Sequence, residues 1–235
     1  MMPNPMKLSL KLEAEFYFQQ GIRYIKTDNY QGAIAFFDKA LRCKPDYTDA
    51  LSQWGFALGS LGRHQEAIAL FDNALAIQPH ACWIWHNRAI ALGKLNRYCE
   101  AINSFERAIE FNPGNFTIWH NRGITFSDWG YHEKAIASFD QTLKLRPNAY
   151  CAWYNRGIAL AQLQRYFDAL NSFDRAIEFQ PDAFLAWNNR GMTLSDWGYY
   201  EKAIASFDRA LEIQPNYQTA LDNRNIALQK LGCCE

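Results

Sequence analysis

The 235-residue chain lacks an excess of charge of either sign, because 24 lysines and arginines balance 24 aspartates and glutamates. A balanced chain has no overall field that gathers phosphates or anionic lipids, so nucleic-acid and membrane-surface binding are disfavoured. It also lacks a long apolar run: residues 1–10 hold no signal-peptide core, and no later stretch is long and apolar enough to span a membrane. We therefore expect a cytoplasmic protein with no membrane insertion.

CxxC pairs of cysteines are missing as well. The six cysteines are scattered without a CxxC motif, which argues against a zinc knuckle and against the disulfide framework of a secreted domain. Reduced structural thiols are the ordinary interpretation. Outside the repeated positions described below, the sequence holds no Ser-His-Asp, Cys-His or paired-carboxylate arrangement, so we expect neither an enzyme nor a bound cofactor.

What the sequence does have is a strict repeat. Apart from Pro3 and Pro5, its prolines are spaced 34 residues apart, at Pro45, Pro79, Pro113, Pro147, Pro181 and Pro215. We number the positions of each repeat from 1 to 34, with proline at position 32. Position 1 is then Ala14, Thr48, Cys82, Phe116, Tyr150, Phe184 and Gln218.

Each repeat carries two stretches of helical periodicity. Small or apolar residues recur at positions 4, 8 and 11 and again at positions 20, 24 and 27, which is the spacing of one face of an α-helix. A short break such as Trp129-Gly130-Tyr131 separates the two stretches, and Asp46, Asn148 and Asp182 after the prolines predict helix N-caps. Glycine at position 8 predicts that the paired helices cross closely. In the fifth repeat these positions hold Trp153, Gly157, Leu160, Ala169, Phe173 and Ala176.

The pattern resembles the tetratricopeptide repeat family, with the W-x-N-R-G form of bacterial repeats at residues 153–157. The resemblance implies an all-α fold, a right-handed α-solenoid of helix-turn-helix repeats, that serves as a scaffold or adaptor for a protein or peptide partner. We expect a lead at 1–13 and a capping helix at 218–235, whose more polar face suits the end of a complete array. Six repeats lie between them, at 14–47, 48–81, 82–115, 116–149, 150–183 and 184–217.

The first helices of such stacks line a concave groove, and position 6 places a row of amides on it. An amide accepts from a backbone N–H and donates to a backbone C=O, so the row would grip an extended peptide; the alternative is bonding between neighbouring helices. Position 9 adds an apolar strip, and positions 2 and 5 add aromatic side chains. The predicted groove residues are Asn87, Asn121, Asn155, Asn189, Asn223, Ile90, Ile124, Ile158, Met192, Trp83, His86, His120 and Tyr154.

The residues at the groove positions argue against two kinds of ligand, chaperone C-termini and RNA. Tetratricopeptide modules that clamp the C-terminal carboxylate of chaperones use lysine and asparagine on the groove stripe, but position 2 is never lysine and position 9 never asparagine here. A helical array that binds RNA needs basic side chains on the groove stripe to contact the RNA. The groove stripe of this chain carries amide and aliphatic side chains instead.

Three further sets of residues each have two interpretations. Arginine at position 7 and a carboxylate at position 25 predict ion pairs between repeats, the alternative being an anion site. Tryptophan at position 4 predicts packing in the hairpin core, the alternative being a stacking platform. His86 and His120 share position 5, but no third ligand completes a metal site. The arginines are Arg88, Arg122, Arg156, Arg190 and Arg224; the tryptophans are Trp85, Trp119, Trp153 and Trp187.

A second rhythm runs at twice the repeat length. The fourth and sixth repeats share GxTxSDWGYxEKAIASFD, which indicates either a duplicated two-repeat block or a ligand that presents one feature twice. Aromatic residues at the turns, Tyr131, Tyr199 and Tyr200, suggest an alternative function, a self-associating structural or assembly protein that forms a weak homo-oligomer.

Overall fold

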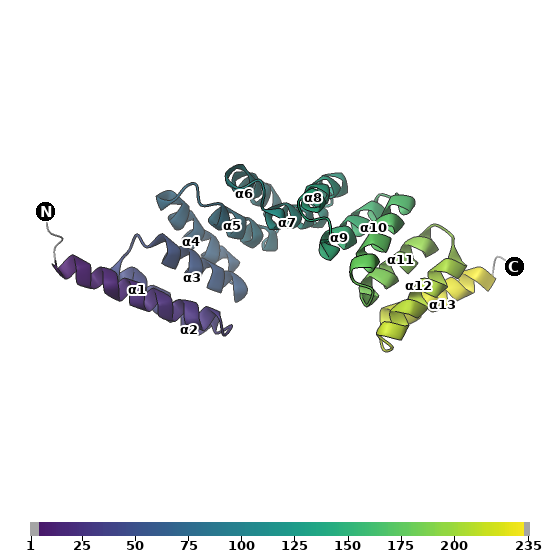
Figure 1. Ribbon diagram of the computed structural model, residues 1–235, viewed down its shortest axis with the longest axis horizontal. Helices are drawn as coiled ribbons and strands as arrows, with labels where there is room; N and C mark the ends of the chain where they lie inside the picture. The colour runs from purple at the N-terminus through teal and green to yellow at the C-terminus, as the bar shows by residue number, and fades with distance from the viewer. Residues whose placement is uncertain (1–4, 233–235) are drawn as a thin grey trace. The chain divides into compact units, whose positions relative to one another are not determined.

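The computed structural model describes residues 5–232, with side-chain environments from residue 9 onward. Thirteen α-helices occupy this range, and it contains no strand. The two helices of each repeat pack antiparallel as a hairpin (Figure 1). The chain is an all-α helical repeat solenoid, as the sequence predicts.

The chain divides into two compact parts, Met1–Gly114 and Asn115–Glu235. The N-terminal part holds α1 (Pro5–Ile25), α2 (Tyr30–Cys43), α3 (Thr48–Ser60), α4 (His64–Ile77), α5 (Cys82–Lys94) and α6 (Tyr98–Phe111). The C-terminal part holds α7 (Phe116–Asp128), α8 (His132–Leu145), α9 (Tyr150–Gln162), α10 (Tyr166–Phe179), α11 (Phe184–Asp196), α12 (Tyr200–Ile213) and α13 (Gln218–Gly232).

Within each part the odd-numbered helices form the inner layer. Helix α3 contacts both α1 and α5, and α9 and α11 contact their odd-numbered neighbours in the same way. Among the described residues of either part, no two even-numbered helices approach each other so closely. Because neighbouring repeats are nearest along their first helices, each stack curves with these helices on its inner side.

The two helices of a hairpin meet at a glycine and a phenylalanine. A Cβ atom added to Gly157 would lie 2.7 Å from the ring of Phe173, which is closer than such atoms can approach. Phe173 is itself only 1% exposed. The predicted close crossing is therefore confirmed: glycine at position 8 lets the position-24 ring fill the space between the helices.

The turn inside each hairpin requires a left-handed residue at position 15. Glycine meets this requirement without strain at three of the six turns, and other residues adopt it at the rest. The φ angles are 78°, 83° and 88° at Gly62, Gly130 and Gly198, and 54°, 58° and 57° at Asp28, Asn96 and Gln164.

The predicted N-caps are wrong by one residue. The caps of α3, α9 and α11 are Tyr47, Ala149 and Ala183, and none of them caps through its side chain. The predicted cap residues instead lie inside a turn that begins before the proline; the Ala183 amide, for example, donates to the carbonyl of Gln180 at 3.1 Å. Proline and then aspartate or asparagine suit the two central positions of such a turn, which explains their spacing.

The first helix extends beyond the repeated positions. Helix α1 begins at Pro5, ahead of position 1 at Ala14. Residues 1–4 of the predicted lead and residues 233–235 of the predicted capping helix, including Cys233 and Cys234, lie outside the described residues. Cys43, Cys82, Cys99 and Cys151 are free thiols. Of the helices described, none is long and apolar enough to cross a membrane.

Candidate functional site

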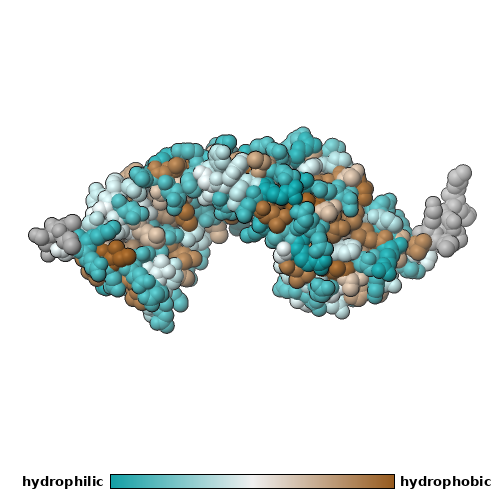
Figure 2. Space-filling view, turned by 180° about the vertical axis from the view of Figure 1, so that it is seen from behind, coloured by the Kyte–Doolittle hydropathy of each residue, from teal (hydrophilic) through white to brown (hydrophobic). Residues whose placement is uncertain are grey.

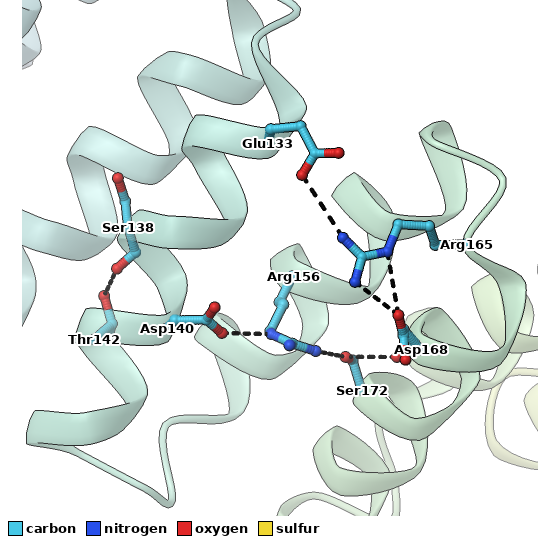
Figure 3. Close-up of polar contacts among 8 residues, drawn as sticks. All are labelled: Glu133, Ser138, Asp140, Thr142, Arg156, Arg165, Asp168 and Ser172. Carbon is cyan, nitrogen blue, oxygen red and sulfur yellow. Dashed lines mark hydrogen bonds and ion pairs between the residues drawn. The ribbon is translucent and has the colours of Figure 1, made fainter.

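The arginine ladder joins successive repeats. Arg156 on α9 pairs with Asp140 on α8 at 2.7 Å, and its other nitrogen donates to Ser172 Oγ on α10 at 2.7 Å (Figure 3). The ion pairs predicted between repeats are confirmed for Arg88 with Asp72, Arg156 with Asp140, Arg190 with Asp174 and Arg224 with Asp208. The serine at position 23, which the sequence reasoning missed, ties each of Arg88, Arg156 and Arg190 to its own hairpin.

The position-4 tryptophans are half-buried at the surface of the hairpins. The Trp153 indole N–H donates to the carbonyl of Pro147 at 2.8 Å, and the guanidinium carbons of Arg156 and Arg175 lie 5.9 and 5.7 Å from its ring centroid. Trp85 and Trp187 have the same three partners at equivalent positions. The packing interpretation thus holds with half-buried rings, and the flanking arginines occupy the faces that a stacking platform needs.

The predicted groove residues all lie on odd-numbered helices. Met192 is 40% exposed, and the other twelve predicted residues are half-buried. They are therefore accessible in part, as a shallow binding surface requires. We call the surface formed by positions 6 and 9 of the odd-numbered helices the first-helix groove.

The amides of this groove are used in two ways. Asn189 donates to the Tyr154 hydroxyl at 2.7 Å, and Asn223 donates to the side-chain oxygen of Asn188 at 3.3 Å. Bonding between neighbouring first helices, the alternative for position 6, is therefore confirmed at these two rungs. The side chains of Asn87 and Asn155 make no such bond among the described residues.

Two cavities open in the first-helix groove at equivalent places. One, of 190 Å³, lies between α3 and α5, and the other, of 270 Å³, lies between α9 and α11. Both are lined by positions 9, 12, 13, 17 and 24 of one repeat and by positions 6, 9, 10 and 13 of the next. Asn87 and Ile90 line the first cavity, whereas Ile158, Asn189 and Met192 line the second.

The walls of these cavities include residues that the sequence reasoning missed. Position 17, His64 or Tyr166, and position 24, Phe71 or Phe173, come from the second helix of the hairpin and form the floor. Position 24 had been assigned only to the core. Helical periodicity describes each helix separately, so it does not reveal a cavity that two first helices and one second helix enclose.

A third cavity, of 410 Å³, lies at the beginning of α7 and α9. His120, Tyr150 and Arg146 contribute to its wall, and the Arg146 guanidinium carbon lies 4.8 Å from the centroid of Phe116, which also lines it. Of the residues predicted for the groove, only His120 takes part. This cavity lies beside the first-helix groove, and nothing in the 34-residue pattern distinguishes it.

Burial keeps the groove histidines neutral near pH 7. It lowers the pKa of His86 to about 4 and lowers the pKa of His120 as well. Each ring packs on the phenylalanine of its own hairpin, His86 at 6.0 Å from Phe105 and His120 at 5.7 Å from Phe139. Nowhere in the described range do three or more histidine, cysteine, aspartate or glutamate side chains gather as metal ligands.

Apolar residues form several patches on the one face of the molecule that Figure 2 presents. There they alternate with polar residues. Surface hydropathy therefore singles out no docking site on this face. Concavity together with side-chain chemistry identifies the first-helix groove as the candidate.

Comparison with known sequences identifies the class of protein. Profiles of the tetratricopeptide repeat family match residues 14–47, 46–113, 116–149, 150–183 and 184–217. The chain belongs to the tetratricopeptide repeat family, whose fold is typical of protein–protein interaction scaffolds. No curated protein sequence matches the chain significantly.

Solved structures share this fold at low identity. The chain is similar to YrrB, described as a TPR protein with an unusual peptide-binding site, with 24% identity and a TM-score of 0.67 over 80% of this chain and 97% of that one. It is similar to the MamA protein, with 20% identity and a TM-score of 0.66 over 72% of this chain and 93% of that one. PilF of Pseudomonas aeruginosa shows 17% identity and a TM-score of 0.75 over 91% and 97% of the two chains.

Proposed function

We propose that the protein is a non-enzymatic scaffold that binds an extended peptide segment of a partner protein in the first-helix groove. The observation that carries this proposal is the repetition of one cavity at the same positions in both parts of the chain. Packed helices lie roughly 8–10 Å apart and an extended strand advances about 3.3 Å per residue, so a peptide meets one repeat per about three residues. YrrB, which has the same fold, is described as having a peptide-binding site.

The groove supplies polar and apolar contacts side by side. The amides of Asn87 and Asn155 have no hydrogen-bond partner within the described chain, so each can donate to and accept from a peptide backbone. Ile90 and Ile158 lie one helical turn from these amides, and the 40% exposed Met192 lines the same cavity as Ile158. Apolar ligand side chains would remove this surface from water and contribute most of the affinity.

The experiment selects ligands from a random dodecapeptide library displayed on phage, with the immobilised chain as bait. Enriched peptides are then titrated against wild type and against the double variant Asn87→Ala/Asn155→Ala. Each lost backbone contact is expected to cost about 0.5–1.5 kcal/mol, or roughly a 2- to 13-fold weakening of Kd per site that the peptide covers. Because ordering a flexible peptide offsets much of the gain, we expect micromolar Kd values.

The matched control is Asn103→Ala/Asn171→Ala, which removes two exposed asparagines from the second helices α6 and α10. Circular dichroism and urea unfolding verify that both double variants fold. A library that yields no binding peptide contradicts the proposal. Enriched peptides that bind both double variants equally well contradict the groove as their site.

A second candidate function is self-association through the turns of the C-terminal part. Tyr131 and Tyr199 are each 46% exposed, and Phe167 is 65% exposed. Tyr200 does not belong to this surface, because it is half-buried with the Lys230 amine 5.7 Å from its ring centroid. Light scattering across a dilution series tests this alternative: a mass that rises with concentration and falls in Tyr131→Ser/Tyr199→Ser supports it, and a constant monomer removes it.

A further inference from the structure

We infer that the cavity between α9 and α11 binds a basic side chain, lysine or arginine, of the partner peptide, and that Asp196 holds its charge. This inference rests on the proposed function and specifies one residue class of the ligand. The cavity has a volume of 270 Å³, below the roughly 300 Å³ at which small-molecule sites begin. This size suits a single side chain of a longer ligand.

The two equivalent groove cavities differ in the charge at their rim. Position 13 of the second contributing repeat is Lys94 in the cavity between α3 and α5, and Asp196 in the cavity between α9 and α11. Position 10 of the same repeat is the apolar Ala91 in the first cavity and the polar Thr193 in the second. At these two positions the second cavity therefore has a negative charge in place of a positive one and a hydroxyl-bearing side chain in place of an alanine.

Two polar side chains of the second cavity, Thr193 and Asn189, already donate to other groups of the chain. Thr193 Oγ donates to the backbone carbonyl of Asn189 at 2.9 Å, and the Asn189 amide nitrogen donates to the Tyr154 hydroxyl at 2.7 Å. The Thr193 oxygen and the Asp196 carboxylate remain as acceptors, and the Tyr166 ring lies in the same wall. A lysine ammonium or an arginine guanidinium carries only donors and is attracted to an aromatic ring, so it complements this set.

Asp196 contributes nothing evident to the stability of its own helix. It is the last residue of α11, where the unpaired carbonyls carry partial negative charge and a carboxylate is unfavourable. The carboxylate has no ion pair or hydrogen bond among the described residues. Lys230, at the same position of α13, is directed to the ring of Tyr200. Lys94, by contrast, is the last residue of α5 and suits its helix end.

The experiment repeats the dodecapeptide selection on wild type and on Asp196→Lys. Asp196 is exposed at a helix end where lysine is favourable, so the variant is expected to fold with at least wild-type stability. Wild type should enrich peptides with lysine or arginine, and replacing that residue by alanine should weaken Kd about ten-fold. Asp196→Lys should lose these peptides. The matched control Glu201→Lys changes the charge equally on the second helix α12, and should keep them.

The outcomes separate this inference from the proposed function. Enriched peptides that depend on Asn87 and Asn155 but show no basic residue, or that bind Asp196→Lys as tightly as wild type, overturn the inference and leave the groove intact. A library without any groove-dependent peptide overturns both. Loss of binding in Glu201→Lys as well as in Asp196→Lys would assign the effect to net charge, and would also overturn the inference.

Discussion

Replacing Arg156 by methionine keeps most of the length of this side chain and removes its charge and donors, which isolates the contribution of the arginine ladder. The Arg156 side chain, 22% exposed, pairs with that of Asp140, 43% exposed, so this pair is worth about 1 kcal/mol at most. Ser172 is fully buried but keeps a second bond, in which its hydroxyl donates to the Asp168 carbonyl at 2.9 Å. Loss of the hydrogen bond from Arg156 to Ser172 therefore costs about 1 kcal/mol, because the serine hydroxyl keeps its other partner and is not left unsatisfied.

The Trp153 ring adds a third contribution, because the Arg156 guanidinium carbon lies 5.9 Å from its centroid, worth about 0.5–1 kcal/mol. These contributions are not fully additive, so we expect Arg156→Met to lower the free energy of unfolding by about 1.5–3 kcal/mol. The assay is equilibrium urea unfolding, followed by circular dichroism and by tryptophan fluorescence. Both probes are needed, because repeat proteins can unfold in steps.

The control for this prediction is Arg165→Met. Arg165 pairs with Asp168 at 2.8 Å and with Glu133 of the preceding repeat at 3.7 Å, but the three side chains are 46%, 43% and 68% exposed. Because exposed pairs contribute little, we expect a loss below about 0.5 kcal/mol. A double-mutant cycle of Arg156→Met with Asp140→Asn should return a coupling of about 1 kcal/mol. Equal effects of the two arginine variants, or no coupling in the cycle, would refute the assignment of the ladder to the cohesion of neighbouring repeats.

Three further predictions concern single positions. Gln164→Gly should raise the free energy of unfolding by about 1 kcal/mol in urea titrations, because the residue has a φ of 57° that glycine adopts without strain; lower stability would contradict this. Gly157→Ala should lower the free energy of unfolding by about 1–3 kcal/mol, since the new Cβ would lie 2.7 Å from the Phe173 ring. An unchanged urea midpoint would show that the two helices can move apart without cost. The pKa of His86 is about 4 in the folded chain and lies below its unfolded value, so the unfolded state binds more protons between about pH 4 and 6.5. Stability should therefore fall as the pH falls through this window, by up to about 3 kcal/mol, and His86→Gln should flatten that slope in urea midpoints measured from pH 4 to 7.

Helix positions were predictable because their causes are local. The 34-residue spacing of the prolines and the periodicity of small and apolar residues place two helices in each repeat, and the structure has them there. The ion pair of Arg156 with Asp140 was also predictable, since a fixed repeat brings position 7 of one hairpin next to position 25 of the preceding one. Even so, the N-caps were assigned one residue early, because the proline turn and the helix start compete for the same polar residues.

The candidate site was only partly predictable, and the reason is physical. Periodicity says which face of a helix is buried, so the sequence by itself determined the all-α repeat, the close crossing at Gly157 and the placement of amides along the first helices. Which amide bonds to a neighbour, as Asn189 does to Tyr154, depends on rotamers and on the distance between helices. The cavities beside Met192 and Asn87 depend on three helices at once. Such long-range packing leaves no mark in a single repeat, so only the tertiary structure decided where a ligand side chain has room.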